Sequence, residues 1–282
     1  MNEVYLNGEF LASDQAKISV FDRGFLLGDG VYEVIPVYAG RSFQLMGHLR
    51  RLQSSLGGVR MQNPMSDAGW TNMINTLIEK NGGGDQSVYL QVTRGVAPRD
   101  HVFPTGVKPT AFAMSNPLQA VPEKYKQQGI AAITLPDIRW RNCNIKAITL
   151  LPNSLLKQQA QDAGAQEALL IRDGYLTEGA VSNAYAVIGG TIYTAPADEK
   201  VLPGITREVV LKLAAQGNIP VIEQAVSEIQ LKQADEIWVS SSTKEVLPIT
   251  RLNGQAVGDG LPGIVWKQID ALYQQYKLSF IE

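Results

Sequence analysis

The chain has 282 residues, of which 45% are hydrophobic and 18% are charged, and its formal net charge at pH 7 is −2. This composition is typical of a soluble globular protein with one large domain or two smaller ones, and it lacks the basic footprint of a nucleic-acid-binding protein. No apolar stretch is long enough to span a bilayer, and the N-terminus lacks the basic-then-apolar pattern of a signal peptide. Cys143 is the single cysteine, so an intrachain disulfide is excluded, and with only two histidines a zinc site is not expected. We therefore expect a cytoplasmic protein that binds neither nucleic acid nor a membrane.

The first part of the chain alternates between strand-like and helix-like patterns. Residues 31–38 alternate in hydrophobicity as a strand does, and a turn connects them to a possible return strand at 42–45. Leucines then recur at helical spacing up to Gly57 and Gly58, which predicts a helix. The elements expected next are a helix at about 66–80 that Ser66 could cap, and strands at 88–94 and about 109–115.

The second part mixes strands and helices without a regular alternation. Two hairpins are expected over residues 167–194, with turns at Asp173-Gly174 and Gly189-Gly190. The other expected elements are strands near 130–135, at 220–226 and at 236–241, and helices at about 154–163, 206–216 and 262–276, with a short helix before the last strand. We predict an α+β protein with a smaller N-terminal α/β domain (1–118), a linker (119–128) and a larger C-terminal domain (129–282) with a mixed or antiparallel sheet.

Lys146 is a cation in an unexpectedly apolar segment, between Cys143, Ile145, Ala147 and Ile148. A lysine held out of water loses stabilisation of its charged form, so its pKa falls and the neutral amine becomes a nucleophile, as in Schiff-base enzymes. The alternative is a lysine whose stem covers apolar surface while its ammonium group reaches water. Lys146 alone favours that alternative, and only the remaining motifs point to chemistry.

Two segments could bind an anion such as phosphate. Gly204-Ile205-Thr206-Arg207 opens a predicted helix, where free backbone N–H groups and the helix dipole favour negative charge. The run Ser240–Thr243, which includes Ser242, ends a predicted strand and supplies hydroxyl groups. An ordinary helix N-cap and a polar strand end are the alternatives, and the sequence does not show that the two segments converge.

Three further sets of residues could belong to a site. His48 and Arg51 lie three residues apart on the leucine helix, where the planar fork of an arginine could bind phosphate. Glu178 follows a hairpin strand and could hold a protonated ring nitrogen. Arg99 and His101 would point the same way from an extended segment and could bind a carboxylate together. A solvated surface position is the alternative for each set.

Together these motifs resemble the fold-type IV pyridoxal-phosphate enzymes, which include D-amino-acid aminotransferases, branched-chain aminotransferases and aminodeoxychorismate lyases. The resemblance covers nearly the whole chain, and the order and spacing of its motifs are specific although each motif is weak alone. The motifs are Asp22-Arg23-Gly24 through Gly28-Asp29-Gly30-Val31-Tyr32-Glu33, His48-Leu49-Arg50-Arg51-Leu52, Asn144-Ile145-Lys146, Glu178-Gly179 through Ser182-Asn183, Gly204-Ile205-Thr206-Arg207, and the Ser/Thr run with Glu245.

The resemblance implies the two-domain fold of these enzymes, pyridoxal 5′-phosphate as the cofactor, and a role for each matching residue. Lys146 would carry the cofactor and move a proton between the substrate Cα and the cofactor. Glu178 would pair with the protonated pyridine nitrogen and keep the ring an electron sink. The phosphate would be bound by Arg51, Ile205, Thr206 and Ser242.

Within the family, the Arg-x-His pair resembles the D-amino-acid aminotransferases, in which a tyrosine, an arginine and a histidine bind the substrate carboxylate. The matching residues are Tyr32, Arg99 and His101. In these relatives the arginine and the histidine come from the neighbouring subunit, so the resemblance implies a homodimer. It also implies transfer of the amino group of D-alanine or a similar donor to 2-oxoglutarate or pyruvate.

Three alternatives remain: an aminodeoxychorismate lyase, an L-branched-chain aminotransferase and a non-catalytic binding protein with the same fold. Arg99 and His101 argue against the first two, and the presence of both Lys146 and Glu178 argues against the third. One departure from the family concerns Ala180 and Val181, which stand where many relatives place hydroxyl residues near the cofactor. The side-chain contacts of those relatives therefore do not carry over to these two positions.

Overall fold

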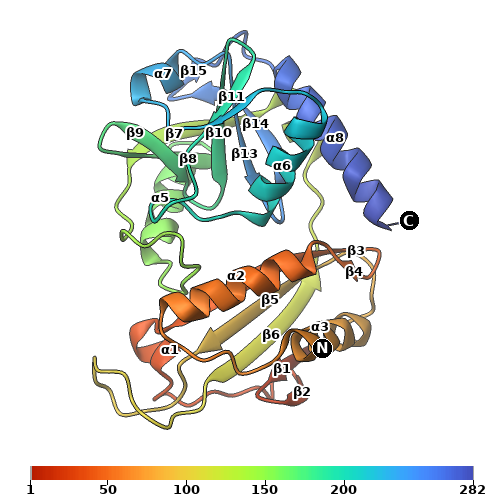
Figure 1. Cartoon of the computed structure of the whole chain (residues 1–282), viewed down its shortest axis with the longest axis vertical. Helices are drawn as coiled ribbons and strands as arrows, with labels where there is room; N and C mark the ends of the chain where they lie inside the picture. The colour runs from red at the N-terminus through yellow and green to blue at the C-terminus, as the bar shows by residue number, and fades with distance from the viewer. Residues whose placement is uncertain (1, 282) are drawn as a thin grey trace. The chain divides into compact units, whose positions relative to one another are not determined.

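The computed structural model describes residues 2–281, which form two compact units (Figure 1). The first unit contains the residues up to Gln119 together with Ile145–Leu150, and the second contains Ala120–Asn144 and Leu151–Phe280. The short segment that carries Lys146 therefore packs with the first unit, although it lies within the range predicted for the C-terminal domain. Among the described residues, no helix has the length and apolar character needed to cross a membrane.

The first unit is built on a six-stranded antiparallel sheet with the strand order β2-β1-β6-β5-β3-β4. Its strands are β1 (Glu3–Leu6), β2 (Glu9–Ala12), β3 (Gly30–Tyr38), β4 (Arg41–Ser42), β5 (Gln86–Thr93) and β6 (Thr110–Pro117). Its helices are α1 (Arg23–Leu27), α2 (Leu45–Gly58) and α3 (Asp67–Lys80). The predicted cap of α3 is confirmed, because the Ser66 hydroxyl accepts a hydrogen bond from the N–H of Gly69.

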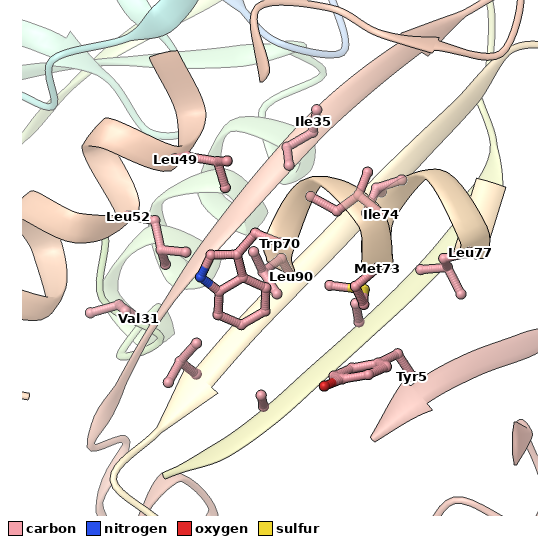
Figure 2. Close-up of a cluster of buried hydrophobic side chains, with 14 of the residues drawn as sticks. Tyr5, Val31, Ile35, Leu49, Leu52, Trp70, Met73, Ile74, Leu77 and Leu90 are labelled. Carbon is pink, nitrogen blue, oxygen red and sulfur yellow. The ribbon is translucent and has the colours of Figure 1, made fainter. Parts of the chain in front are cut away.

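The core of the first unit lies between α2, α3 and one face of this sheet (Figure 2). Leu49 and Leu52 of α2 and Trp70 of α3 pack with alternate side chains of the central strands, such as Ile35 and Leu90. Successive strand residues point to opposite faces, so the predicted alternation along 31–38 explains why one face of β3 is buried here. Burial of each large apolar side chain contributes roughly 1.5–3 kcal/mol to this packing.

The predicted return strand at 42–45 is wrong for most of its length. β4 ends at Ser42, and α2 already begins at Leu45. Gln44 has a left-handed φ of 56°, which ends the extended conformation before the helix. Leu45 then packs against the core as part of α2.

The second unit is built on a nine-stranded mixed sheet with the order β12-β11-β10-β13-β14-β7-β8-β9, and β15 pairs with β14. Its strands are β7 (Ile130–Pro136), β8 (Glu167–Arg172), β9 (Tyr175–Gly179), β10 (Asn183–Ile188), β11 (Thr191–Thr194), β12 (Val221–Glu223), β13 (Glu236–Ser241), β14 (Glu245–Leu252) and β15 (Gln255–Ala256). Its helices are α4 (Glu123–Gln128), α5 (Leu151–Asp162), α6 (Ile205–Gln216), α7 (Glu228–Lys232) and α8 (Ile264–Ile281). The two predicted hairpins are confirmed as β8–β9 and β10–β11.

Most of the range predicted as a linker, 119–128, contains α4 and belongs to the second unit, which starts at Ala120. Lys126 forms ion pairs with Glu245 and Asp270 at 3.3 and 3.2 Å. The Thr250 hydroxyl donates a hydrogen bond to the carbonyl of Gln128 at 2.7 Å. The ion pairs of Lys126 and the bond from Thr250 therefore attach this segment to β14 and α8.

Candidate active site

Lys146 lies on a short segment that extends the sheet of the first unit at the edge of β3. The N–H of Tyr32 donates to the carbonyl of Lys146 at 2.9 Å, and the N–H of Ile148 donates to the carbonyl of Gly30 at 3.1 Å. From the other side, the N–H of Lys146 donates to the hydroxyl of Ser55 on α2 at 3.1 Å. The backbone at Lys146 is therefore fixed between a strand edge and a helix.

The Lys146 ammonium group lies over the ring of Tyr32, with Nζ 4.1 Å from the ring centroid. Tyr32 in turn stacks on Tyr89, with ring centroids 5.7 Å apart. Lys146 is half-buried, and a cation over an aromatic face gains about 0.5–1 kcal/mol where it is partly exposed. The structure thus brings together two of the predicted site residues, Lys146 and Tyr32.

Arg51 and His48 converge on Glu33, a fully buried carboxylate of β3. Arg51 Nε donates to Oε1 at 2.8 Å and Nη2 donates to Oε2 at 2.6 Å, while His48 Nδ1 lies 2.7 Å from Oε2. Burial by itself would raise the pKa of Glu33, but the Arg51 guanidinium and His48 together lower it to about 2. Burial lowers the pKa of His48, which favours the neutral imidazole with its proton on the nitrogen facing Glu33. Arg51 is therefore held in one orientation by two bonds to a charged partner.

Arg99 and His101 lie in the loop between β5 and β6, and both side chains are exposed in the single chain. The loop is irregular at this point, so the strand geometry that would align the two side chains does not apply. Within residues 2–281, neither side chain forms a hydrogen bond or an ion pair. Both remain open to a ligand or to another protein.

Glu178 is a buried carboxylate near the end of β9 in the second unit. It accepts hydrogen bonds from Arg139 Nη1, from Asn183 Nδ2 at 3.0 Å and from the N–H of Leu202 at 3.2 Å. Arg139 is shared, because its Nε and Nη2 both donate to Asp137 at 2.9 Å. Burial raises the pKa of Glu178, and Arg139 offsets this only in part. The site is thus short of positive charge, which a cationic ligand group would supply.

Asn183 connects Glu178 to the N-terminus of α6. Its Nδ2 donates to Glu178 and also to the carbonyl of Leu202 at 2.9 Å. Its Oδ1 lies so close to Gly204 that a Cβ at that position would come within 1.9 Å of it. Gly204 begins α6 without a side-chain cap, so the N–H groups of the first turn, which starts with Ile205 and Thr206, are available for an anion.

The Ser/Thr run reaches the same place from the neighbouring strand. β13 pairs with β10 so that Ser240 lies opposite Asn183, and Ser242 follows in the turn to β14. The Ser240 hydroxyl is already engaged, with its Oγ 2.9 Å from the hydroxyl of Tyr185. The two segments that the sequence marked as anion-binding candidates therefore flank a single residue, Asn183.

The turn after β9 offers few hydroxyls. Ala180 is buried, Val181 is 48% exposed, and the Ser182 hydroxyl donates to Glu167 at 2.9 Å. Asn153 Nδ2 donates to the carbonyl of Ala180 at 2.7 Å, which fixes the backbone of the turn. Here the sequence departs from the family, and the structure uses the turn for internal bonds.

Sequence reasoning gave no role to Glu33, Arg139 or Asn183. Glu33 and Asn183 lie inside the motifs given above, and this position is a sequence signal that both belong to the site. Arg139 lies outside every motif, and only its pairing with Asp137 and Glu178 in the folded chain reveals its place. Among the described residues, no group of His, Cys, Asp and Glu side chains could hold a metal ion.

Comparison with known proteins decides the family, because the model of amino-transferase class IV matches residues 30–252. This chain belongs to the class IV aminotransferases. Two relatives are the D-alanine aminotransferases of Bacillus licheniformis, 41% identical, and Staphylococcus epidermidis, 39% identical, each over 98% of this chain and 98% of its own length.

Solved structures agree on the fold. The branched-chain amino acid aminotransferase of Escherichia coli has a TM-score of 0.93 with 27% identity, over 97% of this chain and 94% of its own. A second branched-chain amino acid aminotransferase, solved with pyridoxamine 5′-phosphate, has a TM-score of 0.90 with 25% identity, over 97% and 93%. The predicted fold-type IV architecture and aminotransferase class are confirmed, and pyridoxal 5′-phosphate is the cofactor of this family.

Proposed function

We propose that this chain transfers amino groups from D-amino acids, of which D-alanine is the type, to 2-oxo acids such as 2-oxoglutarate or pyruvate in two half-reactions at one site. The observation that carries the proposal is its 41% identity to a D-alanine aminotransferase over 98% of both chains. A single cysteine fits work in the reducing cytoplasm, which we propose as its location.

The residues of the second unit have the chemistry that pyridoxal phosphate requires. Glu178 is a buried carboxylate whose charge Arg139 offsets only in part, and the N-terminus of α6 has no side-chain cap and can bind an anion. Asn183 contacts both of them, so an acceptor for a ring N–H and donors for a phosphate group occur together. When bound, the cofactor supplies the carbonyl that takes up the amino group and a ring that accepts the electron pair of the substrate Cα–H bond.

Lys146 would be the amine that carries the cofactor and then, when released, takes the proton from the substrate Cα and returns it to the cofactor C4′. Its backbone is fixed by Tyr32 and Ser55, so only the side chain has to move between these tasks. Glu178 would keep the ring nitrogen protonated, and burial strengthens that interaction because it removes competing water.

The phosphate group would be bound by Arg51, Ile205, Thr206 and Ser242, the residues at the positions that the family resemblance implies. Ile205 and Thr206 would donate backbone N–H groups from the first turn of α6, and Thr206 and Ser242 would add hydroxyls. Arg51 would supply the positive charge. Its two bonds to Glu33 orient the guanidinium before the phosphate arrives, which reduces the entropy lost on binding.

We further propose that the substrate carboxylate is bound by Tyr32 together with Arg99 and His101, the last two from the partner subunit of a homodimer. Exposure of both side chains supports this, because neither has a partner to leave among residues 2–281. Exposed apolar side chains stand on the loop of Arg99 and His101 and on the segment that is hydrogen-bonded to it, and a monomer of this size would rarely leave them uncovered. These are Ile18, Val20, Phe21, Phe25, Val96 and Val102.

A steady-state assay with three substrate sets tests this function. We expect D-alanine with 2-oxoglutarate to react at least about 100-fold faster than L-leucine with 2-oxoglutarate, because one enantiomer alone presents its Cα–H bond to Lys146 when its carboxylate is bound. Preference for L-leucine would instead make the chain a branched-chain aminotransferase. Turnover of aminodeoxychorismate, with neither amino acid reacting, would make it a lyase.

A further inference from the structure

The loop that carries Arg99 and His101 is fastened from beneath by a buried arginine. Arg23 is only 2% exposed, and its Nη1 donates to the carbonyl of Asp100 at 2.6 Å and to that of Val102 at 3.5 Å. Asp100 stands between Arg99 and His101 in the chain, so this bond restrains the backbone that carries both side chains.

A second buried arginine holds the same loop at Phe103. Arg94 is 7% exposed, and its guanidinium lies over the ring of Phe103, with Cζ 3.7 Å from the ring centroid. Its Nη2 donates to the carbonyl of Val59 at the end of α2 at 2.7 Å. The loop is therefore attached through a cation–π contact to a group that is itself anchored to a helix.

One carboxylate oxygen joins the two arginines. Asp29 Oδ2 accepts from Arg23 Nε at 2.8 Å and from Arg94 Nε at 2.7 Å. Burial alone would raise the pKa of Asp29, but the two guanidinium groups lower it, so this carboxylate is charged at neutral pH. Asp29 directly precedes β3, the strand that carries Tyr32, and the N–H of Arg94 donates to its carbonyl at 3.1 Å.

We propose that Arg23, Asp29 and Arg94 are positioning residues that hold the loop of Arg99 and His101 in the conformation that binds the substrate carboxylate. This inference rests on the proposed function of that loop. It gives a role to the Asp22-Arg23-Gly24 and Gly28-Asp29-Gly30 motifs, which the cofactor site does not use. The three residues touch neither the substrate nor the cofactor and act through the loop.

If the three residues had a purely structural role, their loss would lower the free energy of unfolding but would not raise the Michaelis constants while leaving kcat unchanged. Loosening of the loop has a different signature, because it weakens the capture of every carboxylate substrate and leaves the Lys146 chemistry intact once the substrate is bound. The Michaelis constants for D-alanine and for 2-oxoglutarate should then rise together, while kcat at saturation changes little.

Arg23→Lys is the sharpest variant, because lysine keeps the charge beside Asp29 but a single ammonium group cannot also hold the carbonyl of Asp100. Phe103→Leu is a second variant on a partly exposed side chain, so it should fold even if the first does not. Lys80→Gln is the matched control, because Lys80 forms a half-exposed ion pair with Glu3 in the same unit, away from this loop.

Two readouts are measured on the cofactor-loaded protein: amide hydrogen exchange of peptides that cover residues 96–103, and both Michaelis constants. For Arg23→Lys we expect faster exchange in these peptides and a rise of about 10- to 100-fold in both constants, with kcat within about 3-fold. Phe103→Leu should change both readouts in the same direction by less, and Lys80→Gln should change neither.

Unchanged exchange in Arg23→Lys and Phe103→Leu would overturn the proposal, and so would a fall in kcat with unchanged Michaelis constants. Arg99→Ala separates this failure from a failure of the proposed function. If the exchange is faster but neither Arg23→Lys nor Arg99→Ala changes the Michaelis constants, the loop does not bind the carboxylate, and the positioning role falls with it.

Discussion

Glu33 in the first unit and Glu178 in the second are both buried carboxylates that touch an arginine, yet their pKa values move in opposite directions. Glu33 has Arg51 through two bonds and His48 through a third, and its pKa falls to about 2. Glu178 receives a single bond from Arg139, whose other donors are taken by Asp137, and burial raises its pKa. The charge of Glu33 is thus compensated by partners inside the protein, whereas the charge of Glu178 is compensated only in part and could pair with a cationic ligand.

The first prediction concerns Lys146. Lys146→Ala should reduce transamination to an undetectable rate, because it removes the amine that we propose carries the cofactor and moves the proton, whereas Glu33 and Glu178 keep their partners. An assay of D-alanine with 2-oxoglutarate measures the loss. Turnover near that of the wild type would contradict the proposed role of Lys146.

Glu178→Gln should lower kcat by about 100- to 1,000-fold, which corresponds to the ~3–4 kcal/mol typical of removing one preorganised electrostatic contact from an active site. The same change should not destabilise the cofactor-free protein at pH 7. A raised pKa means that the charged carboxylate opposes folding, and Arg139 keeps Asp137 as its partner. Steady-state kinetics and thermal unfolding of the cofactor-free variant check the two parts. A large loss of stability with normal kcat would reverse the assignment of the two carboxylates.

Glu33→Gln should have the opposite profile. It leaves the buried Arg51 without its charged partner, so the free energy of unfolding should fall by about 3–5 kcal/mol. Urea unfolding of the cofactor-free protein at pH 7 measures this effect, with Lys80→Gln as a surface control. Equal stability of Glu33→Gln and the wild type would mean that the ion pair between Glu33 and Arg51 does not stabilise the fold.

The stabilisation from Glu33 should also depend on pH in a defined direction. Its pKa falls from 4.5 to about 2 on folding, a difference equivalent to about 3 kcal/mol. Because the folded pKa is the lower one, this contribution is complete above about pH 5 and is lost as the pH falls from 4.5 toward 2. The stability difference between the wild type and Glu33→Gln should shrink over that window. A difference that stays constant down to pH 3 would be inconsistent with the lowered pKa.

The smallest effect is expected at Asn183, which links Glu178 to the N-terminus of α6. Asn183→Ala removes one bond to Glu178 and one to the carbonyl of Leu202, and a lost bond to a buried charged group costs about 1.5–3 kcal/mol. Cofactor affinity should therefore fall by roughly 10- to 100-fold. Titration of the cofactor-free protein with pyridoxal phosphate, followed by its visible absorbance, measures the change. Unaltered affinity would mean that Asn183 does not organise the site.

The sequence predicted the parts of this molecule whose signals are local. The alternation along β3, the leucine spacing of α2, the Ser66 cap and the Gly-rich hairpin turns each depend on neighbouring residues, and each is found. The return strand at 42–45 failed because a single left-handed residue, Gln44, converts a strand pattern into a helix start. No local pattern distinguishes that conformation at a glutamine.

The candidate site shows the same division. Motifs predicted Lys146, Glu178 and the α6 N-terminus as site candidates, and the chemistry proposed for them depends on burial that the sequence does not contain. Arg139 could not be found, because its importance comes from contacts with Glu178 and Asp137 that only folding creates. The same holds for Arg23, whose bond to the carbonyl of Asp100 spans 77 positions of the chain.

The most direct test of the account is a single half-reaction of the cofactor-loaded protein with D-alanine and no acceptor. The visible absorbance of the bound cofactor is followed while pyruvate is quantified, and the addition is repeated with L-leucine. We expect D-alanine alone to bleach the absorbance and to release one pyruvate per subunit. Bleaching by L-leucine alone, or an absorbance unchanged by D-alanine, would contradict the account.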